Sequence, residues 1–152
     1  MLSWPVPSTV AGVDTTVLAV RTGGAQRVVD LTGPCQDWIA QVGAQDGLLH
    51  VFVPHATAGV AIIETGAGSD DDLLAALDTL LPHGGPHGRG WRHAHGSPGH
   101  GRDHVLPAFV RPDATLPVVD GQLTLGTWQS VVLVDTNIDN PQRQVRLSFL
   151  AG

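Results

Sequence analysis

The chain consists largely of short segments that are rich in apolar and β-branched residues and are separated by turn residues. Only two segments favour helices, about 33–45 and 69–82, and they do not alternate regularly with the strands. The pattern therefore predicts an α+β fold with antiparallel β-sheets or a sandwich and two main helices. At 152 residues, of which 42% are hydrophobic, the chain is predicted to form one domain over 1–152. The predicted strands are 13–22, 26–31, 47–54, 59–64, 114–120, 122–125, 128–136 and 144–150.

End signals accompany both predicted helices. Ser69 stands where the N-cap of the second helix is expected, and Asp72 completes a capping-box pattern. Thr32 is predicted to cap the first helix, and Asp120-Gly121 predicts a tight hairpin turn. Four leucines of the second helix are predicted to face the core: Leu73, Leu77, Leu80 and Leu81.

Composition excludes several kinds of chemistry. Lysine and tyrosine are absent, so neither a Schiff-base or P-loop lysine nor a phenolic acid is available. The formal net charge of −6, without a basic run, argues against nucleic-acid binding. Cys35 is the single cysteine, so an internal disulfide is excluded and a reducing compartment is expected. With no signal-peptide pattern and no apolar run of roughly 18 residues, we expect a cytoplasmic protein without membrane contact.

Histidines are concentrated in one glycine-rich segment. Six of the eight lie between residues 83 and 104, and 83–101 is predicted to be a long loop. The spacing leaves open whether this run binds a metal ion or is a solvated loop. His93 follows Trp91, and His104 precedes an apolar run, so both are predicted to be held in place. The others stand among glycines and prolines and are expected to be exposed and replaceable: His83, His87, His95 and His100.

His55 differs from the histidines of the loop. It follows the predicted strand over 47–54 and precedes a turn of small residues, which would leave space for a ligand above the imidazole. Imidazoles from strand ends and loops favour Zn²⁺ over Mg²⁺, because Mg²⁺ prefers oxygen ligands.

Several short motifs together resemble one known family over about residues 10–150. They are His55 with Thr57 to Gly59, Glu64, Trp91-Arg92-His93, His104, Gly126 to Gln129, and Arg143. This combination resembles the YjbQ-like family, which is often labelled secondary thiamine-phosphate synthase.

The resemblance implies an α+β homotrimer with a divalent metal on His55, His93 and His104, for which zinc is expected before magnesium. It also implies a small anionic or phosphorylated ligand and a weak thiamine-phosphate synthase activity. Glu64 or Asp135 would be the general base, and Arg143 would meet an anionic group. Substrate contacts would come from Thr57, Trp128 and Gln129. The sequence departs from the family pattern at Ile63 and Thr65, where amides are usual, and at Asp135, where glutamate is usual.

Three functions stay open from the sequence. The first is a metal-dependent enzyme, with three protein ligands and an open fourth position on the ion. The second is a non-catalytic metal-binding structural homotrimer, for which four protein ligands would be typical. The third is a protein that binds a small molecule without a metal. Each of these site residues also has a structural alternative. Glu64 and Asp135 could form strand-end salt bridges instead. Trp128 could be a packed wall of the site, and Arg143 could be a surface residue of a strand.

Overall fold

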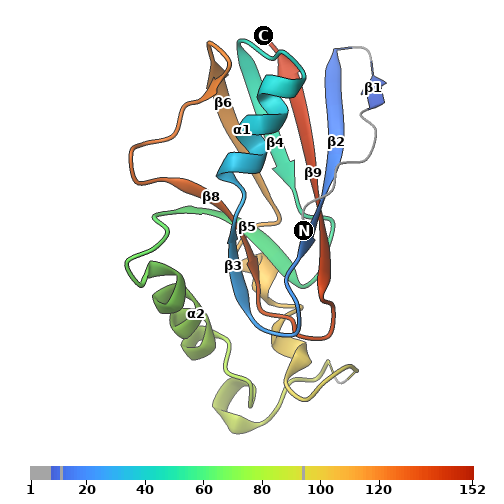
Figure 1. The fold of residues 1–152 in the computed structure, drawn as a ribbon. Helices are drawn as coiled ribbons and strands as arrows, with labels where there is room; N and C mark the ends of the chain where they lie inside the picture. Colours follow the sequence, from blue (N-terminus) through green and yellow to red (C-terminus); the bar gives the residue numbers. More distant parts are fainter. Residues whose placement is uncertain (1–7, 11, 94) are drawn as a thin grey trace.

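Two antiparallel sheets form the framework of the computed structural model, which describes residues 8–10, 12–93 and 95–152 (Figure 1). Neighbouring strands pair antiparallel throughout the described residues. The larger sheet has the order β1 (Ser8–Val10), β2 (Val13–Arg21), β9 (Gln142–Ala151), β4 (Gly47–Phe52), β6 (Asp113–Val119) and β7 (Gln122–Leu123). The smaller sheet has the order β3 (Arg27–Asp30), β8 (Ser130–Asp135) and β5 (Ala58–Ile63). The predicted α+β class is confirmed, and β1 is a strand that the sequence did not predict.

The main core lies between the two sheets and includes helix α1 (Thr32–Gln41). Cys35, Trp38 and Ile39 of α1 are fully buried there. Side chains of both sheets complete this core, among them Leu18, Leu49, Leu133 and Leu147. Each fully buried aliphatic side chain of this kind stabilises the fold by roughly 1.5–3 kcal/mol relative to exposure.

The four central residues of strand β8, Val131 to Val134, are all apolar because both faces of the strand are covered. Val131 and Leu133 belong to the main core, and Val132 and Val134 belong to a second cluster on the opposite face. Successive side chains of a strand point to opposite faces, so burial on both sides requires an uninterrupted apolar run. The second cluster also contains residues of helix α2 (Ser69–Leu80) and of the segments that follow it: Leu77, Leu81, Leu106 and Val110.

Helix α2 begins differently from the capping box predicted by the sequence. Its N-cap is Gly68, with a φ of 96°, and no side chain caps the helix. Ser69 is already helical, and its amide donates to the Gly66 carbonyl, so a glycine turn supplies the cap. The predicted leucine stripe is also narrower than expected, since Leu80 is 53% exposed while Leu77 is buried.

Thr32 is likewise not a helix cap. It is the first residue of α1, and its hydroxyl accepts a hydrogen bond from the Val131 amide at 2.9 Å, which joins the helix to β8. The carboxylate of Asp30 accepts from the Thr32 amide instead, at 2.8 Å. The hairpin prediction is confirmed, because Asp120 and Gly121 both have positive φ angles, 50° and 72°, between β6 and β7.

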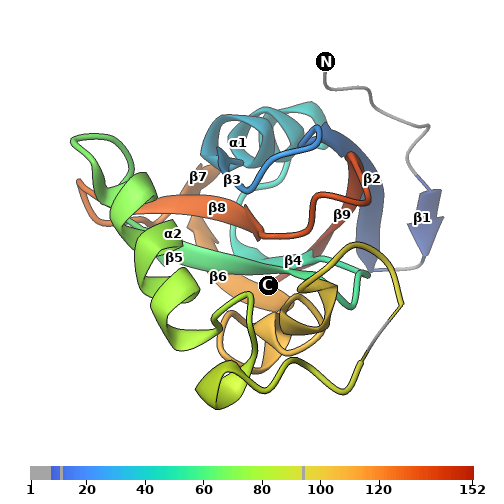
Figure 2. The same ribbon diagram turned by 90° about the horizontal axis from the view of Figure 1, so that it is seen from below.

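The chain between α2 and β6 lies beside α2 at one end of the smaller sheet (Figures 1 and 2). It is irregular apart from three 3₁₀ turns in its described part: η1 (Pro86–Gly88), η2 (His100–Arg102) and η3 (Leu106–Ala108). The indole of Trp91 anchors it, since its N–H donates to the Pro82 carbonyl at 2.9 Å. In the described residues, no helix is both long and apolar enough to cross a membrane.

Candidate metal centre

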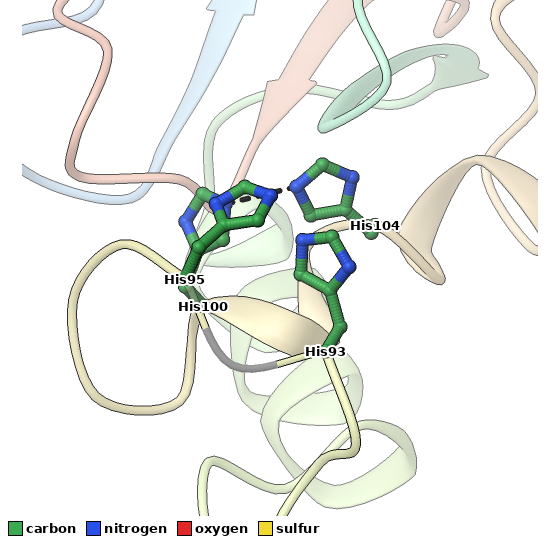
Figure 3. A group of neighbouring side chains, drawn as sticks. All are labelled: His93, His95, His100 and His104. Carbon is green, nitrogen blue, oxygen red and sulfur yellow. Dashed lines mark hydrogen bonds between the residues drawn. The ribbon is translucent and has the colours of Figure 1, made fainter.

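Four histidines of the loop converge on one point (Figure 3). They are His93, His95, His100 and His104, and one ring nitrogen from each lies within 4.8 Å of the others. The ring centroid of His93 lies 4.1 Å from that of His95 and 4.0 Å from that of His104. These side chains therefore form a cluster of nitrogen donors, here called the histidine cluster.

The spacing of the histidine cluster fits a zinc ion. Zinc–nitrogen bonds of 2.0–2.1 Å in a tetrahedron place ligand nitrogens about 3.3 Å apart. The Nε2 atoms of His100 and His104 are 2.9 Å apart, and no pair in the cluster exceeds 4.8 Å. Side-chain adjustments of no more than about 1.5 Å would thus close four ligands around an ion. A set of only nitrogen donors does not suit Mg²⁺.

His100 is oriented by residues that follow β8. Its side chain is only 9% exposed, and its Nδ1 atom lies 2.8 Å from Oδ2 of Asp139 and 2.9 Å from Nδ2 of Asn137. When Nδ1–H donates to the Asp139 carboxylate, the Nε2 lone pair faces the cluster, which is the arrangement a metal ligand needs. The amide of Ser97 also donates to Asp139, and this hydrogen bond is the main reason that the pKa of Asp139 is lowered.

A buried aspartate fixes the segment that carries His104. Asp103 accepts hydrogen bonds from the Thr136 hydroxyl at 2.6 Å and from the Asn137 amide group at 3.2 Å. Both donors come directly after the end of β8. The histidine cluster is therefore tied to the smaller sheet rather than to the loop alone.

Two further contacts hold the turn η2 in place. Arg102 is 1% exposed, and its Nη1 atom donates to Oδ1 of Asp78 in α2 at 2.6 Å. Gly101 packs so closely that a Cβ atom there would collide with the side chain of Trp91 and the carbonyl of His93. A side chain at Gly101 would push apart the segments that bring His93 and His104 together.

The imidazoles of His93 and His104 favour the neutral form. Loss of solvent around the ring is the main cause that lowers the pKa of His93, followed by the charges that His95 and His100 would carry. The same causes lower the pKa of His104, with solvent loss again the largest. Neutral imidazole is the form that binds a metal ion.

His55, predicted as a metal ligand, is not a member of the histidine cluster. Its Nε2 atom accepts a hydrogen bond from the Gln144 amide at 2.8 Å. Burial is the main cause that lowers its pKa, and the charge of Arg143 lowers it further. The structure thus joins His93 and His104, as predicted, but places His95 and His100 beside them. His100 was expected to be exposed, but its side chain is only 9% exposed because the Asp139 carboxylate holds it, whereas His95 is exposed as expected. That these two histidines are replaceable stays a prediction.

Asp135 and Arg143 form a buried ion pair near His55. Arg143 donates from Nε and Nη2 to the two carboxylate oxygens, at 2.8 and 2.7 Å, and both side chains are at most 1% exposed. This geometry fits the alternative role predicted for Asp135, a strand-end salt bridge. The alternative predicted for Arg143, a surface position, is wrong because its side chain is buried. Thr57, also predicted to touch a substrate, is buried just before β5 at the same end of the sheet.

The remaining predicted residues lie at the opposite end of β5 and β8. Ala58 pairs with Asp135 and Ile63 with Ser130, so the two ends are separated by roughly 17 Å of strand. Glu64 follows Ile63 and is exposed, and Trp128 is 72% exposed rather than a packed wall. Gln129 accepts a hydrogen bond from the Gly126 amide at 2.8 Å. The catalytic and substrate roles of these residues stay predictions.

Two pockets adjoin His93. One has a volume of about 510 Å³ and includes both His93 and His104 in its lining. The other, of about 400 Å³, also borders His93 and Trp91 and is lined mainly by the glycine-rich segment and His83.

Cys35 takes no part in the site. Burial, reinforced by the charge of Asp30, raises the pKa of its thiol to about 12, so this thiol is neither a ligand nor a nucleophile at neutral pH.

Two antiparallel sheets with a cluster of four imidazoles at one end define an α+β protein with a candidate metal centre. Residues 16–152 match the family described as UPF0047 protein YjbQ-like. The chain therefore belongs to the YjbQ-like UPF0047 family, and the resemblance noted from its motifs is confirmed.

Relatives in this family extend across bacteria and archaea. The UPF0047 protein Rv2556c of Mycobacterium tuberculosis is 59% identical over 140 residues, covering 92% of this chain and all of that protein. The UPF0047 protein YugU of Bacillus subtilis is 26% identical over 129 residues, covering 82% of this chain and 89% of that protein. The crystal structure of the hypothetical protein APE1520 from Aeropyrum pernix K1 is 34% identical with a TM-score of 0.79, covering 91% of this chain and 98% of that one.

The fold is also shared with more distant proteins. A YbjQ-like protein of unknown function from Sulfolobus solfataricus superposes with a TM-score of 0.83 at 24% identity, covering 92% of this chain and 98% of that one. The names of these relatives state a family and no reaction. Function therefore has to be argued from the site itself.

Proposed function

We propose that this protein is a metal-dependent enzyme with a zinc ion bound in the histidine cluster. The observation that carries the proposal is the convergence of four imidazole nitrogens within 4.8 Å, two of them from histidines that line a pocket of about 510 Å³. A pocket of this size is typical of sites for small molecules.

Three members of the cluster are anchored and one is not. His100 is held by Asp139, His104 follows the buried Asp103, and the backbone carbonyl of His93 packs against Gly101, although the His93 ring itself is exposed. His95 is exposed and makes ring contacts but no hydrogen bond within the described residues. We infer that His93, His100 and His104 bind the ion and that a water molecule, rather than His95, holds the fourth position. His55, bonded to the Gln144 amide, is not part of this set.

A zinc ion with an open position activates water or polarises a carbonyl group. The surrounding residues supply position rather than acid–base chemistry. Asp139 keeps the ligand nitrogen of His100 directed at the ion, and the pocket partly shields the reacting group from solvent. Neither Glu64, at the far end of the sheet, nor Asp135, in its ion pair, is a free base beside the cluster.

Thiamine-phosphate synthesis, implied by the resemblance, would be a slow secondary activity. Its pyrophosphate leaving group needs Mg²⁺ on oxygen ligands or several cationic side chains. The histidine cluster offers nitrogen donors only, which suit zinc chemistry on water or a carbonyl better, and the adjoining pocket contains only two arginines, Arg89 and Arg92.

The alternative function is a structural metal site in a non-catalytic homotrimer. The number of histidines favours it, because four imidazoles are enough to fill a tetrahedral zinc site. The two functions differ in the number of protein ligands on the ion.

X-ray absorption of the zinc-loaded protein, combined with hydrolysis of p-nitrophenyl acetate, distinguishes these functions. The enzyme is expected to show three nitrogen ligands and one oxygen, and a zinc-dependent hydrolysis that is lost in His93→Ala. Four nitrogen ligands without zinc-dependent hydrolysis would support the structural site instead. A chain that binds no zinc at all would refute both.

A further inference from the structure

The pocket of about 510 Å³ beside the histidine cluster has a composition of its own. It is formed almost entirely by the loop between α2 and η3, and the candidate ligands His93 and His104 stand in its wall. The rest of its lining includes Pro86, Arg89, Trp91, Arg92 and Val105.

The charge of this pocket is opposite to that of the whole chain. The formal net charge of the protein is −6, yet the lining contains two arginines and no carboxylate. Arg89 and Arg92 are exposed, and neither has an ion-pair partner among the described residues. Arg102, Arg111 and Arg143 each pair with an aspartate, whereas Arg21, Arg27 and Arg146, like the two pocket arginines, have no ion pair among the described residues. Two unpaired guanidinium groups at the rim of one pocket can together bind a phosphate or a carboxylate.

The pocket also has a firm apolar wall. Trp91 is half-buried, packs against the second core cluster, and is fixed by its hydrogen bond to Pro82. Val105 and Pro86 extend this apolar surface on either side. A rigid indole can hold a flat apolar group by stacking at little cost in conformational entropy.

From these features we infer that the pocket binds a small organic anion that carries a phosphate or carboxylate on an apolar or aromatic group. The anionic group contacts Arg89 and Arg92, and the apolar group lies against Trp91. The ligand thereby lies next to His93 and His104, where the proposed ion would bind. This inference rests on the proposed function and names the substrate class of the same site.

Calorimetric titration with phenyl phosphate tests the inference in metal-free and in zinc-loaded protein. We expect Arg89→Gln and Arg92→Gln each to weaken binding about tenfold, because each removes a charge-assisted hydrogen bond. Arg146→Gln is the matched control, since it removes an exposed arginine on β9, away from the pocket, and binding should not change. Benzoate and inorganic phosphate, as further titrants, show whether the anion, the ring or both are recognised.

The titrations separate the inference from the zinc proposal. If the protein binds no zinc but binds phenyl phosphate through the two arginines, the pocket is supported and the proposed function fails. Stronger binding of phenyl phosphate or benzoate than of inorganic phosphate would support the apolar wall. Failure of phenyl phosphate and benzoate to bind either form would overturn the inference. So would equal losses in Arg89→Gln, Arg92→Gln and Arg146→Gln, or benzyl alcohol binding as tightly as phenyl phosphate.

Discussion

The Nδ1 atom of His100 lies 2.8 Å from Oδ2 of Asp139, so a carboxylate that follows β8 orients an imidazole in the turn η2. Residues 39 positions apart in the chain are thereby joined within the candidate metal centre. If Asp139 sets the tautomer of His100, Asp139→Ala should weaken zinc binding about ten- to a hundredfold, as is usual when such a partner is lost.

Competition against a chromogenic zinc chelator measures this effect. Asp71→Ala is a suitable control, because Asp71 is exposed in the first turn of α2 and also carries one negative charge. Equal zinc affinity for Asp139→Ala and the wild type would show that Asp139 does not orient a ligand.

Removal of the Asp78 carboxylate should destabilise the fold. Arg102 is 1% exposed and depends on Asp78, and its Nε and Nη2 atoms already lack hydrogen-bond partners within the described residues. Asp78 is 46% exposed, so we expect a loss of about 2 kcal/mol in Asp78→Ala, below the roughly 3–5 kcal/mol for a fully buried pair.

Urea unfolding measures the change in the free energy of unfolding. Asp113→Ala serves for comparison, since it breaks an ion pair with Arg111, whose side chain is 75% exposed. That change should cost about 0.5 kcal/mol or less. Equal losses in the two variants would mean that the Arg102 pair has no special role.

The metal-free protein should become less stable as the pH falls from 7.5 to 5.5. The pKa values of His55, His93 and His104 all lie below the ordinary 6.5 in the folded state. The unfolded chain therefore binds protons first, so stability is full above pH 6.5 and is lost as pH falls through the folded pKa values. Asp139 contributes nothing in this window, because its pKa lies below 3.8.

Thermal unfolding at the two pH values tests this dependence, and the drop in Tm should be smaller in His55→Gln, which cannot take up a proton. A Tm that rises on acidification would contradict the direction of these pKa shifts. Zinc affinity should decline over the same window, because protons compete for the imidazole nitrogens.

A trimer is the expected assembly in solution, on the strength of the family resemblance. Light scattering at micromolar concentration should give three times the chain mass of 15.9 kDa. A mass equal to one chain would exclude the trimer and with it the structural alternative for the metal site.

The framework could be predicted from the sequence because its signals are local. Runs such as Val131 to Val134 are apolar at every position, and Asp120-Gly121 marks a turn that needs two positive φ angles. The N-cap of α2 was predicted wrongly, because the sequence pattern pointed to the Ser69 side chain as the cap. In the structure the helix begins at a left-handed turn of Gly68, without a side-chain cap.

The candidate site could be predicted only in part, because its contacts are remote in the chain. His93 and His104 were identified from their anchored neighbours and do lie together. His100 stands among glycines, which suggested a free loop residue, but the Asp139 carboxylate holds it in place. No local pattern reveals that the segment after β8 folds back onto the turn η2.

Zinc titration of alanine variants at His100 and His55 tests the histidine cluster most directly. If the ion binds among His93, His100 and His104, His100→Ala should lose zinc affinity by a hundredfold or more, while His55→Ala should bind like the wild type. The opposite result, a loss in His55→Ala with no change in His100→Ala, would place the ion with the remote His55 and contradict the proposed site.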